Sequence, residues 1–170
     1  MLAPFGKTVK RLISSARYRV DDGSMSPALR HGDQVLAVSG GGPYRRGEVV
    51  VFKQPFQVPG APTQVYIKRI IGLPQEEIFF DQGMVRINGS VLLEDYLPEN
   101  AQGLSVGQAR ETARIWITDP GEYFVLGDQR EDSRDSRNFG PVSEILFLGR
   151  VWLRYWPIRS WSINSGEGQF

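Results

Sequence analysis

Short apolar runs alternate with polar turns along most of the chain. β-Branched and aromatic residues dominate these runs, and eleven prolines and 19 glycines separate them. Strands are predicted at 34–38, 48–52, 64–71, 77–80, 84–87, 91–93, 113–117, 123–126 and 148–156. The pattern therefore predicts a mostly β fold, with a helical turn at 142–146 before the last long strand.

The strands between residues 76 and 93 are predicted to form a meander. Residues 81–83 make its first turn, and the pair Asn88 and Gly89 makes the second. An Asn-Gly pair between apolar runs is a strong hairpin signal, because both residues tolerate a positive φ. We expect this meander to belong to a smaller β-subdomain near 75–120.

A chain of 170 residues fits one domain. The main domain is expected to span 20–157 and to carry the subdomain as an insertion. An N-terminal segment, 1–19, precedes it, and a tail, 158–170, follows it.

The N-terminal segment has an amphipathic pattern. Its apolar residues lie near one helical face: Leu2, Phe5, Val9, Leu12, Ile13 and Ala16. Its basic residues lie elsewhere: Lys7, Lys10, Arg11 and Arg17. The segment predicts a basic helix on an anionic membrane surface. A short helix packed on the domain, or the remnant of an anchor, is the alternative, since no run of about 20 apolar residues is present.

Charge and composition narrow the function classes. Twenty Lys and Arg balance 19 Asp and Glu, for a net charge of +1, which excludes a general nucleic-acid binder. The chain has no cysteine, so disulfides, thiolate catalysis and cysteine zinc sites are excluded. His31, the single histidine, lies in a predicted turn. We expect no metal and no cofactor.

Two residues 44 positions apart stand out as candidate chemistry. Ser24 lies in a tight turn that contains Gly23 and Pro27, and Lys68 lies in an apolar strand. A serine hydroxyl is a poor nucleophile unless a base takes its proton. A lysine is such a base only when burial keeps it neutral, because its unperturbed pKa is about 10.4. An apolar strand supplies that burial.

A third segment, 121–142, runs from an apolar strand into a loop dense in Asp, Arg and Ser. Ordering such a loop is costly unless its charges pair and its hydroxyl groups find partners. The loop is therefore expected to be tied down by ion pairs.

Together, these segments resemble the type I signal peptidase family of Ser-Lys serine proteases. Residues 24–29 (SMSPAL) match its nucleophile motif, and 66–74 (YIKRIIGLP) match its lysine motif. Residues 127–140 (GDQREDSRDSRNFG) match its late motif, and 149–157 (GRVWLRYWP) are typical of how the domain ends. The match spans roughly 20–157, and three ordered motifs are far more specific than one.

The chain departs from the family pattern at several positions. Substitutions within the motifs are Ala28, Gln75, Gln129, Glu131 and Asp132. Two residues before the nucleophile, where some members have a serine that binds the oxyanion, this chain has Asp22. An ionised carboxylate there repels an oxyanion. The backbone N–H of Ser24 is thus the expected main oxyanion donor, and the second donor is unidentified.

The resemblance implies roles for further residues. Ser24 is the nucleophile, Lys68 is the general base, and Ser133 orients the lysine ammonium. Two ion pairs are expected to hold the late loop: Asp128 with Arg69, and Asp135 with Arg137. Three residues are expected to line the substrate site or desolvate the lysine: Met25, Tyr66 and Ile70.

The resemblance implies a signal-peptidase-like β-rich catalytic core and hydrolysis of the bond after N-terminal signal peptides. The partners are then precursor proteins and a membrane surface, at the extracytoplasmic face of the bacterial cell membrane. A cytoplasmic location stays open, because no anchor or export signal is evident. Two other functions also stay open: a soluble Ser-Lys protease that matures one dedicated partner, and a non-catalytic module that binds extended peptides.

Overall fold

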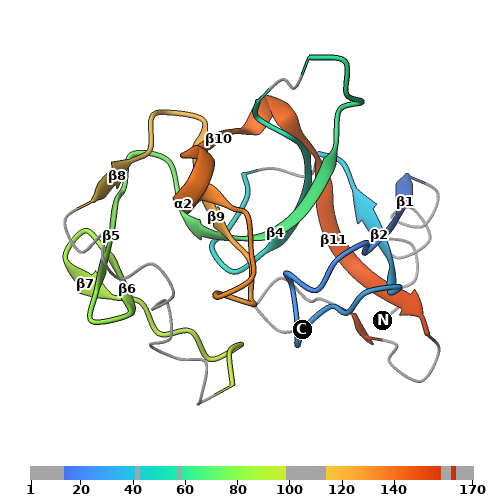
Figure 1. Ribbon diagram of the computed structural model, residues 1–170, viewed down its shortest axis with the longest axis horizontal. Coiled ribbons are helices and arrows are strands. Elements are labelled where there is room, and N and C mark those ends of the chain that lie inside the picture. The colour runs from blue at the N-terminus through green and yellow to red at the C-terminus, as the bar shows by residue number, and fades with distance from the viewer. Residues whose placement is uncertain (1–13, 41–42, 57–58, 99–113, 158–161, 164–170) are drawn as a thin grey trace, which may run out of the picture.

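Two antiparallel sheets make up the protein (Figure 1). The computed structural model describes residues 14–40, 43–56, 59–98, 114–157 and 162–163. The larger sheet contains β1 (Ser15–Arg19), β2 (Gln34–Val38), β3 (Val49–Lys53), β4 (Val65–Gly72), β9 (Glu122–Leu126), β10 (Val142–Ser143), β11 (Phe147–Trp156) and β12 (Ser162–Ile163). The smaller sheet contains β5 (Glu77–Asp81), β6 (Met84–Ile87), β7 (Ser90–Val91) and β8 (Ile115–Ile117). The helical elements of the described residues are α2 (Ser136–Phe139) and the 3-10 turn η2 (Glu144–Leu146). The prediction of a mostly β fold is confirmed.

Strand β4 lies inside the larger sheet, whose order is β1-β2-β11-β3-β4-β9-β10, with β12 beside β11. Its apolar residues alternate between two core clusters. Ile67 packs in the cluster that includes Met25 and Leu29, whereas Ile70 packs in the one that includes Phe52 and Val125. Because β4 is covered on both faces, most of its side chains are buried whichever way they point.

The smaller sheet has the order β7-β6-β5-β8 and is built on tight turns. Gln82 and Gly83 between β5 and β6, and Asn88 and Gly89 between β6 and β7, all have positive φ. Two consecutive positive φ values are what a two-residue hairpin turn of the right twist requires. The predicted Asn-Gly hairpin is therefore confirmed, and the sheet falls within 75–120.

A third core cluster joins the two sheets. It combines Ile71 and Phe124 of the larger sheet with Ile78 and Trp116 of the smaller one. At Gly72, the end of β4, the two sheets approach closely, since a Cβ there would lie 2.7 Å from the Ile78 side chain. The smaller sheet is thus packed directly against the end of the strand that carries Lys68.

The N-terminal segment differs from the helix predicted for residues 2–18. Residues 15–19 form β1 and pair with β2, Ser15 opposite Val38 and Arg19 opposite Gln34. Pairing with β2 gives the backbone N–H and C=O groups of these residues hydrogen-bond partners, which the last turn of an isolated helix leaves partly unpaired. Residues 1–13, which carry most of the predicted helix, lie outside the described residues.

The predicted helical turn at 142–146 is half strand and half helix. Val142 and Ser143 pair with β9 as β10, and only 144–146 form the 3-10 turn η2.

In the predicted tail, Ser162 and Ile163 form β12 against β11, and the other residues of the tail lie outside the described ones. Within the described parts of the chain, no helix has both the length and the apolar character needed to cross a membrane.

Candidate active site

The turn that carries Ser24 lies between β1 and β2 and is anchored in the core. The Ser26 N–H donates to the Gly23 carbonyl at 2.9 Å, and the Leu29 N–H donates to the Met25 carbonyl at 2.8 Å. The side chains of Met25 and Leu29 have no exposed surface. The two buried apolar side chains that follow Ser24 therefore hold this serine, itself 5% exposed, in a fixed place.

Lys68 reaches this turn from the middle of β4. Its Nζ lies 2.5 Å from the Oγ of Ser24. The lysine side chain is 1% exposed, and its backbone pairs with that of Val50 in β3. A strand covered on both faces therefore delivers a buried amine to a serine 44 residues away in the sequence.

Burial lowers the pKa of Lys68. It lowers the pKa of the lysine, because the charged form loses its hydration, and it outweighs the nearby carboxylates of Asp22, Asp135 and Asp128, which raise it. The pKa of Lys68 thus lies below its ordinary value of 10.5. This is the shift that a lysine base requires.

The late loop, residues 127–140, is tied to the nucleophile turn. The N–H of Gln129 donates to the Ser24 carbonyl at 2.9 Å. Gly127 is packed so closely that a Cβ there would lie 2.2 Å from the Oγ of Ser133 and 2.5 Å from the Ser24 carbonyl oxygen. Only glycine leaves room for this crossing of the two segments.

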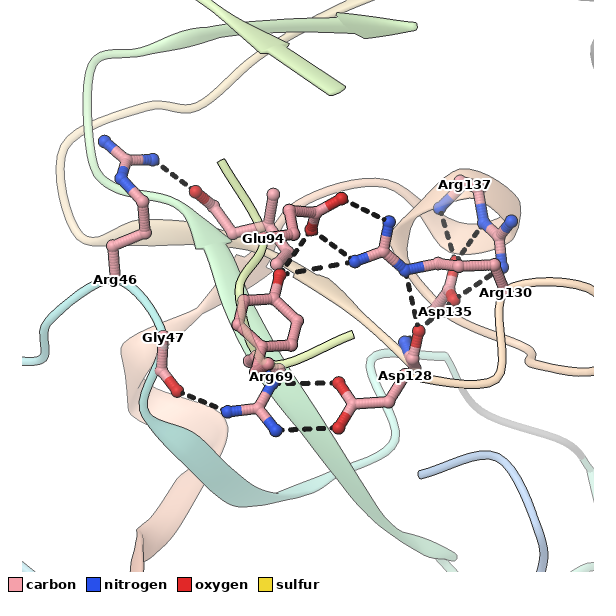
Figure 2. Close-up of polar contacts among 11 residues, drawn as sticks. Arg46, Gly47, Arg69, Glu94, Asp128, Arg130, Asp135 and Arg137 are labelled. Carbon is pink, nitrogen blue, oxygen red and sulfur yellow. Dashed lines mark hydrogen bonds and ion pairs between the residues drawn. The ribbon is translucent and has the colours of Figure 1, made fainter. Parts of the chain in front are cut away.

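The first predicted ion pair, between Arg69 and Asp128, is formed and completely buried (Figure 2). Nε and Nη2 of Arg69 donate to the two carboxylate oxygens at 2.8 and 2.7 Å, and Nη1 donates to the Gly47 carbonyl at 2.9 Å. The guanidinium also stacks on the ring of Tyr96, 4.1 Å from its centre. Three hydrogen bonds satisfy the buried charge, so this pair fastens the late loop to β4.

Sequence reasoning missed a second buried pair beside it. Arg130 of the late loop binds the carboxylate of Glu94, with one contact of 2.9 Å, and its Nε donates to the Gly127 carbonyl at 3.0 Å (Figure 2). Tyr96 donates its hydroxyl to Glu94 and lies within 3.3 Å of Arg130. Arg130 was visible as part of the late motif, but nothing local marks Glu94, 36 residues away, as its partner.

The second predicted pair, Asp135 with Arg137, caps the short helix α2. Asp135 accepts hydrogen bonds from the side chain of Arg137 at 2.9 and 2.8 Å. The same carboxylate accepts from the N–H of Gly127 at 3.1 Å, and the Ser136 hydroxyl accepts from the N–H of Val125 at 2.9 Å. The pair therefore closes the late loop onto its own start.

Ser133 does not form its predicted hydrogen bond with Lys68. Its Oγ is buried and has no hydrogen-bond partner, although it lies beside Gly127 and the Ser24 carbonyl. The amine of Lys68 contacts the Oγ of Ser24 at 2.5 Å instead. A buried hydroxyl without a hydrogen-bond partner is rare and costly, so Ser133 is a candidate to bind a group that the resting site does not supply.

Of the three residues expected to line the substrate site or desolvate the lysine, two are fully buried. Met25 and Ile70 have no exposed surface and belong to two different core clusters. Packing of the sheet faces therefore makes them core residues, and their contact with a substrate stays a prediction. Tyr66 is half-buried, and the amine of Lys68 lies 5.7 Å from its ring centre, so Tyr66 helps to cover the lysine.

The expected oxyanion donor is already occupied. The N–H of Ser24 donates to the Oδ1 of Asp22 at 3.0 Å, and the hydroxyl of Ser24 donates to the same oxygen at 2.7 Å. Asp22 is an exposed residue of the same turn. Its carboxylate therefore lies at the position where sequence analysis expected a negative charge to repel an oxyanion.

Replacing Gly127 with alanine is expected to lower cleavage by about 100-fold, because displacing a nucleophile by about 1 Å has an effect of this size. The new Cβ would push on the Ser24 carbonyl and on Ser133. We expect the free energy of unfolding to fall by about 1–3 kcal/mol as well. Gly23→Ala is the control for stability, since a Cβ at Gly23 meets nothing within 4 Å. Equal melting temperatures for the two variants would contradict the tight crossing at Gly127.

Comparison with known proteins shows which family this chain resembles. The family model described as "Signal peptidase, peptidase S26" matches residues 4–156. The probable signal peptidase I-2 of Synechocystis is 35% identical over 155 residues, which are 88% of this chain and 66% of that protein. Signal peptidase I of Bacillus caldolyticus is 33% identical over 163 residues, which cover 91% of this chain and 86% of that protein. Signal peptidase IB of Staphylococcus aureus is 31% identical over 86% of this chain and 81% of its own.

Proposed function

The chain belongs to the signal peptidase family, peptidase S26, and is a serine endopeptidase of the signal peptidase I type; we propose that Ser24 and Lys68 carry its chemistry. The family acts on precursors that carry signal peptides. We infer that this chain hydrolyses the peptide bond that follows such a signal peptide. Ser24 is the nucleophile of this proposal and Lys68 its general base.

One observation supports the assignment above the others. A lysine that is 1% exposed places its amine 2.5 Å from a serine hydroxyl in a turn held by its own core contacts. A buried cation without a bound anion is costly, so a lysine in such a site is kept for a purpose other than stability. Proton transfer from the serine is the reaction that this distance permits.

The first half of the reaction forms an acyl-enzyme. Neutral Lys68 accepts the hydroxyl proton of Ser24 while Oγ attacks the scissile carbonyl carbon. The carbonyl oxygen becomes negative and is stabilised by the N–H of Ser24, once that donor is free. The Lys68 ammonium then gives its proton to the leaving amine, the C–N bond breaks, and an ester to Ser24 remains.

The second half releases the product. Neutral Lys68 takes a proton from a water molecule, whose oxygen attacks the ester carbonyl. The Lys68 ammonium returns a proton to Oγ as the ester bond breaks, so Ser24 and Lys68 end as they began. We propose that Ser133, whose buried hydroxyl has no partner in the resting site, accepts a hydrogen bond from the ammonium in these steps.

We also propose where the reaction takes place. The family is that of membrane-associated signal peptidases, and the N-terminal segment has a basic amphipathic pattern. Basic amphipathic segments bind anionic membrane surfaces through buried apolar area and charge attraction. We infer that the chain works against the extracytoplasmic face of the bacterial cell membrane.

The test is to incubate the purified chain with an unprocessed secretory precursor and to determine the product masses, with and without anionic lipid vesicles. A single cut at the end of the signal peptide, absent in Ser24→Ala, is the expected result. Faster cleavage on vesicles is expected if the N-terminal segment binds the surface. A precursor that stays intact under both conditions would contradict the proposal and favour a protease with one dedicated partner or a peptide-binding module.

A further inference from the structure

The carboxylate of Asp22 is hydrogen-bonded to the proposed nucleophile. Its Oδ1 accepts two hydrogen bonds from Ser24, one from the backbone N–H at 3.0 Å and one from the hydroxyl at 2.7 Å. The amine of Lys68 contacts the same hydroxyl at 2.5 Å from the other direction. Ser24 is therefore bridged between an acid and a base.

Counting hydrogens shows which way this bridge is polarised. A serine hydroxyl has one hydrogen to donate, and an ionised carboxylate can only accept. While Asp22 is in place, the hydrogen of Ser24 points to Asp22, so the contact with Lys68 requires the lysine to be the donor. General-base catalysis needs the opposite direction, with the serine donating to a neutral lysine.

The other hydrogen bond of Asp22 affects the transition state. The Ser24 N–H, the oxyanion donor of the proposed mechanism, is already bonded to Oδ1. A substrate carbonyl can use that N–H only after the carboxylate has left, and a carboxylate that stayed near would repel the developing oxyanion. Both of its hydrogen bonds therefore oppose the reaction.

Electrostatics keeps the carboxylate charged. Burial acts to raise the pKa of Asp22, but the hydrogen bonds from Ser24 and the nearby amine of Lys68 act against it, and the pKa lies below its ordinary value. In return, the negative charge of Asp22 raises the pKa of Lys68 against the effect of burial. The two charged groups thus favour each other in the resting site.

We propose that Asp22 is an autoinhibitory cap on Ser24, and that the scissile carbonyl of a bound substrate displaces it. This proposal rests on the proposed function of Ser24 and Lys68. The cap is able to move, because Asp22 is exposed and Gly23, which links it to Ser24, has open space around it. With the cap displaced, the hydrogen of Ser24 turns to Lys68 and the N–H becomes free for the oxyanion.

The experiment compares Asp22→Ala with Asp21→Ala in the cleavage of a signal-peptide substrate. Asp21 is the matched control, since it carries the same charge one residue earlier and its side chain is 84% exposed. Removing the cap is expected to raise kcat/KM at pH 7 by about tenfold, the net worth of one charge-assisted hydrogen bond. Asp21→Ala should stay within about twofold of the wild type.

A second measurement separates the cap from a merely structural role. The rise of kcat/KM with pH should move to lower pH in Asp22→Ala, because the lysine loses a neighbouring negative charge that raises its pKa. Asp22→Asn keeps the size of the side chain and removes its charge, so it should shift the profile in the same direction. If Asp22→Ala fails to fold, Asp22→Asn replaces it in the measurement of the pH profile.

The outcomes separate the cap from the proposed function. Unchanged or lower kcat/KM in both Asp22 variants, together with an inactive Ser24→Ala, would overturn the cap and leave the proposed function standing. An active Ser24→Ala, or a wild type without cleavage, would overturn the proposed function itself. A rise in kcat/KM with an unmoved pH profile would also overturn the cap as described, since its charge would then not act on Lys68.

Discussion

Lys68→Met is expected to lower kcat/KM by at least about 10⁴-fold, because Asp22 is the one other titratable group of the described residues that is hydrogen-bonded to the Ser24 hydroxyl. Methionine fills a similar volume without a charge, so the core around β4 should keep its packing. Lys53→Met is the matched control, since Lys53 lies exposed at the end of β3. Cleavage of a signal-peptide substrate by both variants, at equal protein concentration, measures the difference.

The pH dependence of the wild type tests the same lysine. The neutral amine is the active form, so kcat/KM should rise with pH and level off above the pKa of Lys68, which burial places below 10.5. The stability of the protein should change with pH in the same direction as kcat/KM. The folded protein releases this proton more readily than the unfolded chain, so the free energy of unfolding rises with pH between the folded pKa and 10.5.

Lys68→Met should lack this rise in stability and should be at least as stable as the wild type near pH 7. Urea unfolding at several pH values measures it. Near-normal cleavage by Lys68→Met would remove the lysine from the reaction. A flat kcat/KM from pH 6 to 10 would show that no titrating lysine is required.

Asp128→Ala is expected to lower the free energy of unfolding by about 3–5 kcal/mol, because it leaves the charge of Arg69 buried without a partner. The two side chains of this pair are 1% and 0% exposed. Asp81→Ala is the matched control. It breaks the pair with Arg86, whose side chains are 42% and 28% exposed, and should change stability by about 0–1 kcal/mol.

Urea unfolding of both variants, with the slope of the transition checked for two-state behaviour, gives the comparison. Replacing Arg69 by Met and Asp128 by Leu together should recover much of the loss, since no unpaired charge then remains. If Asp128→Ala costs no more than Asp81→Ala, the buried pair does not hold the late loop.

The contrast between Lys68 and Arg69 follows from strand geometry. The two are neighbours in β4, so their side chains point to opposite faces. One face presents the amine to Ser24, and the other binds Asp128 and the ring of Tyr96. One short segment thus supplies both the proposed base and the attachment of the loop that packs on the nucleophile turn.

The strands of the sheets were largely predictable from local pattern. The ranges 34–38 and 84–87 coincide with β2 and β6, and the Asn88-Gly89 hairpin is formed. Alternation of apolar residues and the φ preferences of glycine and asparagine act over a few residues, so they are visible in the sequence. The helix predicted to run to residue 18 was wrong over 15–18, because pairing with β2 is a contact between strands that periodicity does not record.

Some features of the candidate site were also predictable from the sequence, and others were not. The serine turn and the apolar strand indicated Ser24 and Lys68, and the resemblance to the signal peptidase family implied the two ion pairs of the late loop. Nothing in the sequence indicated that Glu94 binds Arg130, or that Met25 and Ile70 lie entirely in the core. Partner choice and depth of burial depend on which segments pack together, and those segments are tens of residues apart.

The sequence by itself determined the β-rich class, the turn that holds Ser24 and the apolar strand that holds Lys68, because these depend on short-range preferences of the backbone. Only the tertiary structure decided which hydrogen bonds these groups make. It directed Lys68 to Ser24, left Ser133 without a partner and set Asp22 on the nucleophile. A hydrogen bond depends on tenths of an ångström and on competition among several donors and acceptors, and that competition exists only once the chain has folded.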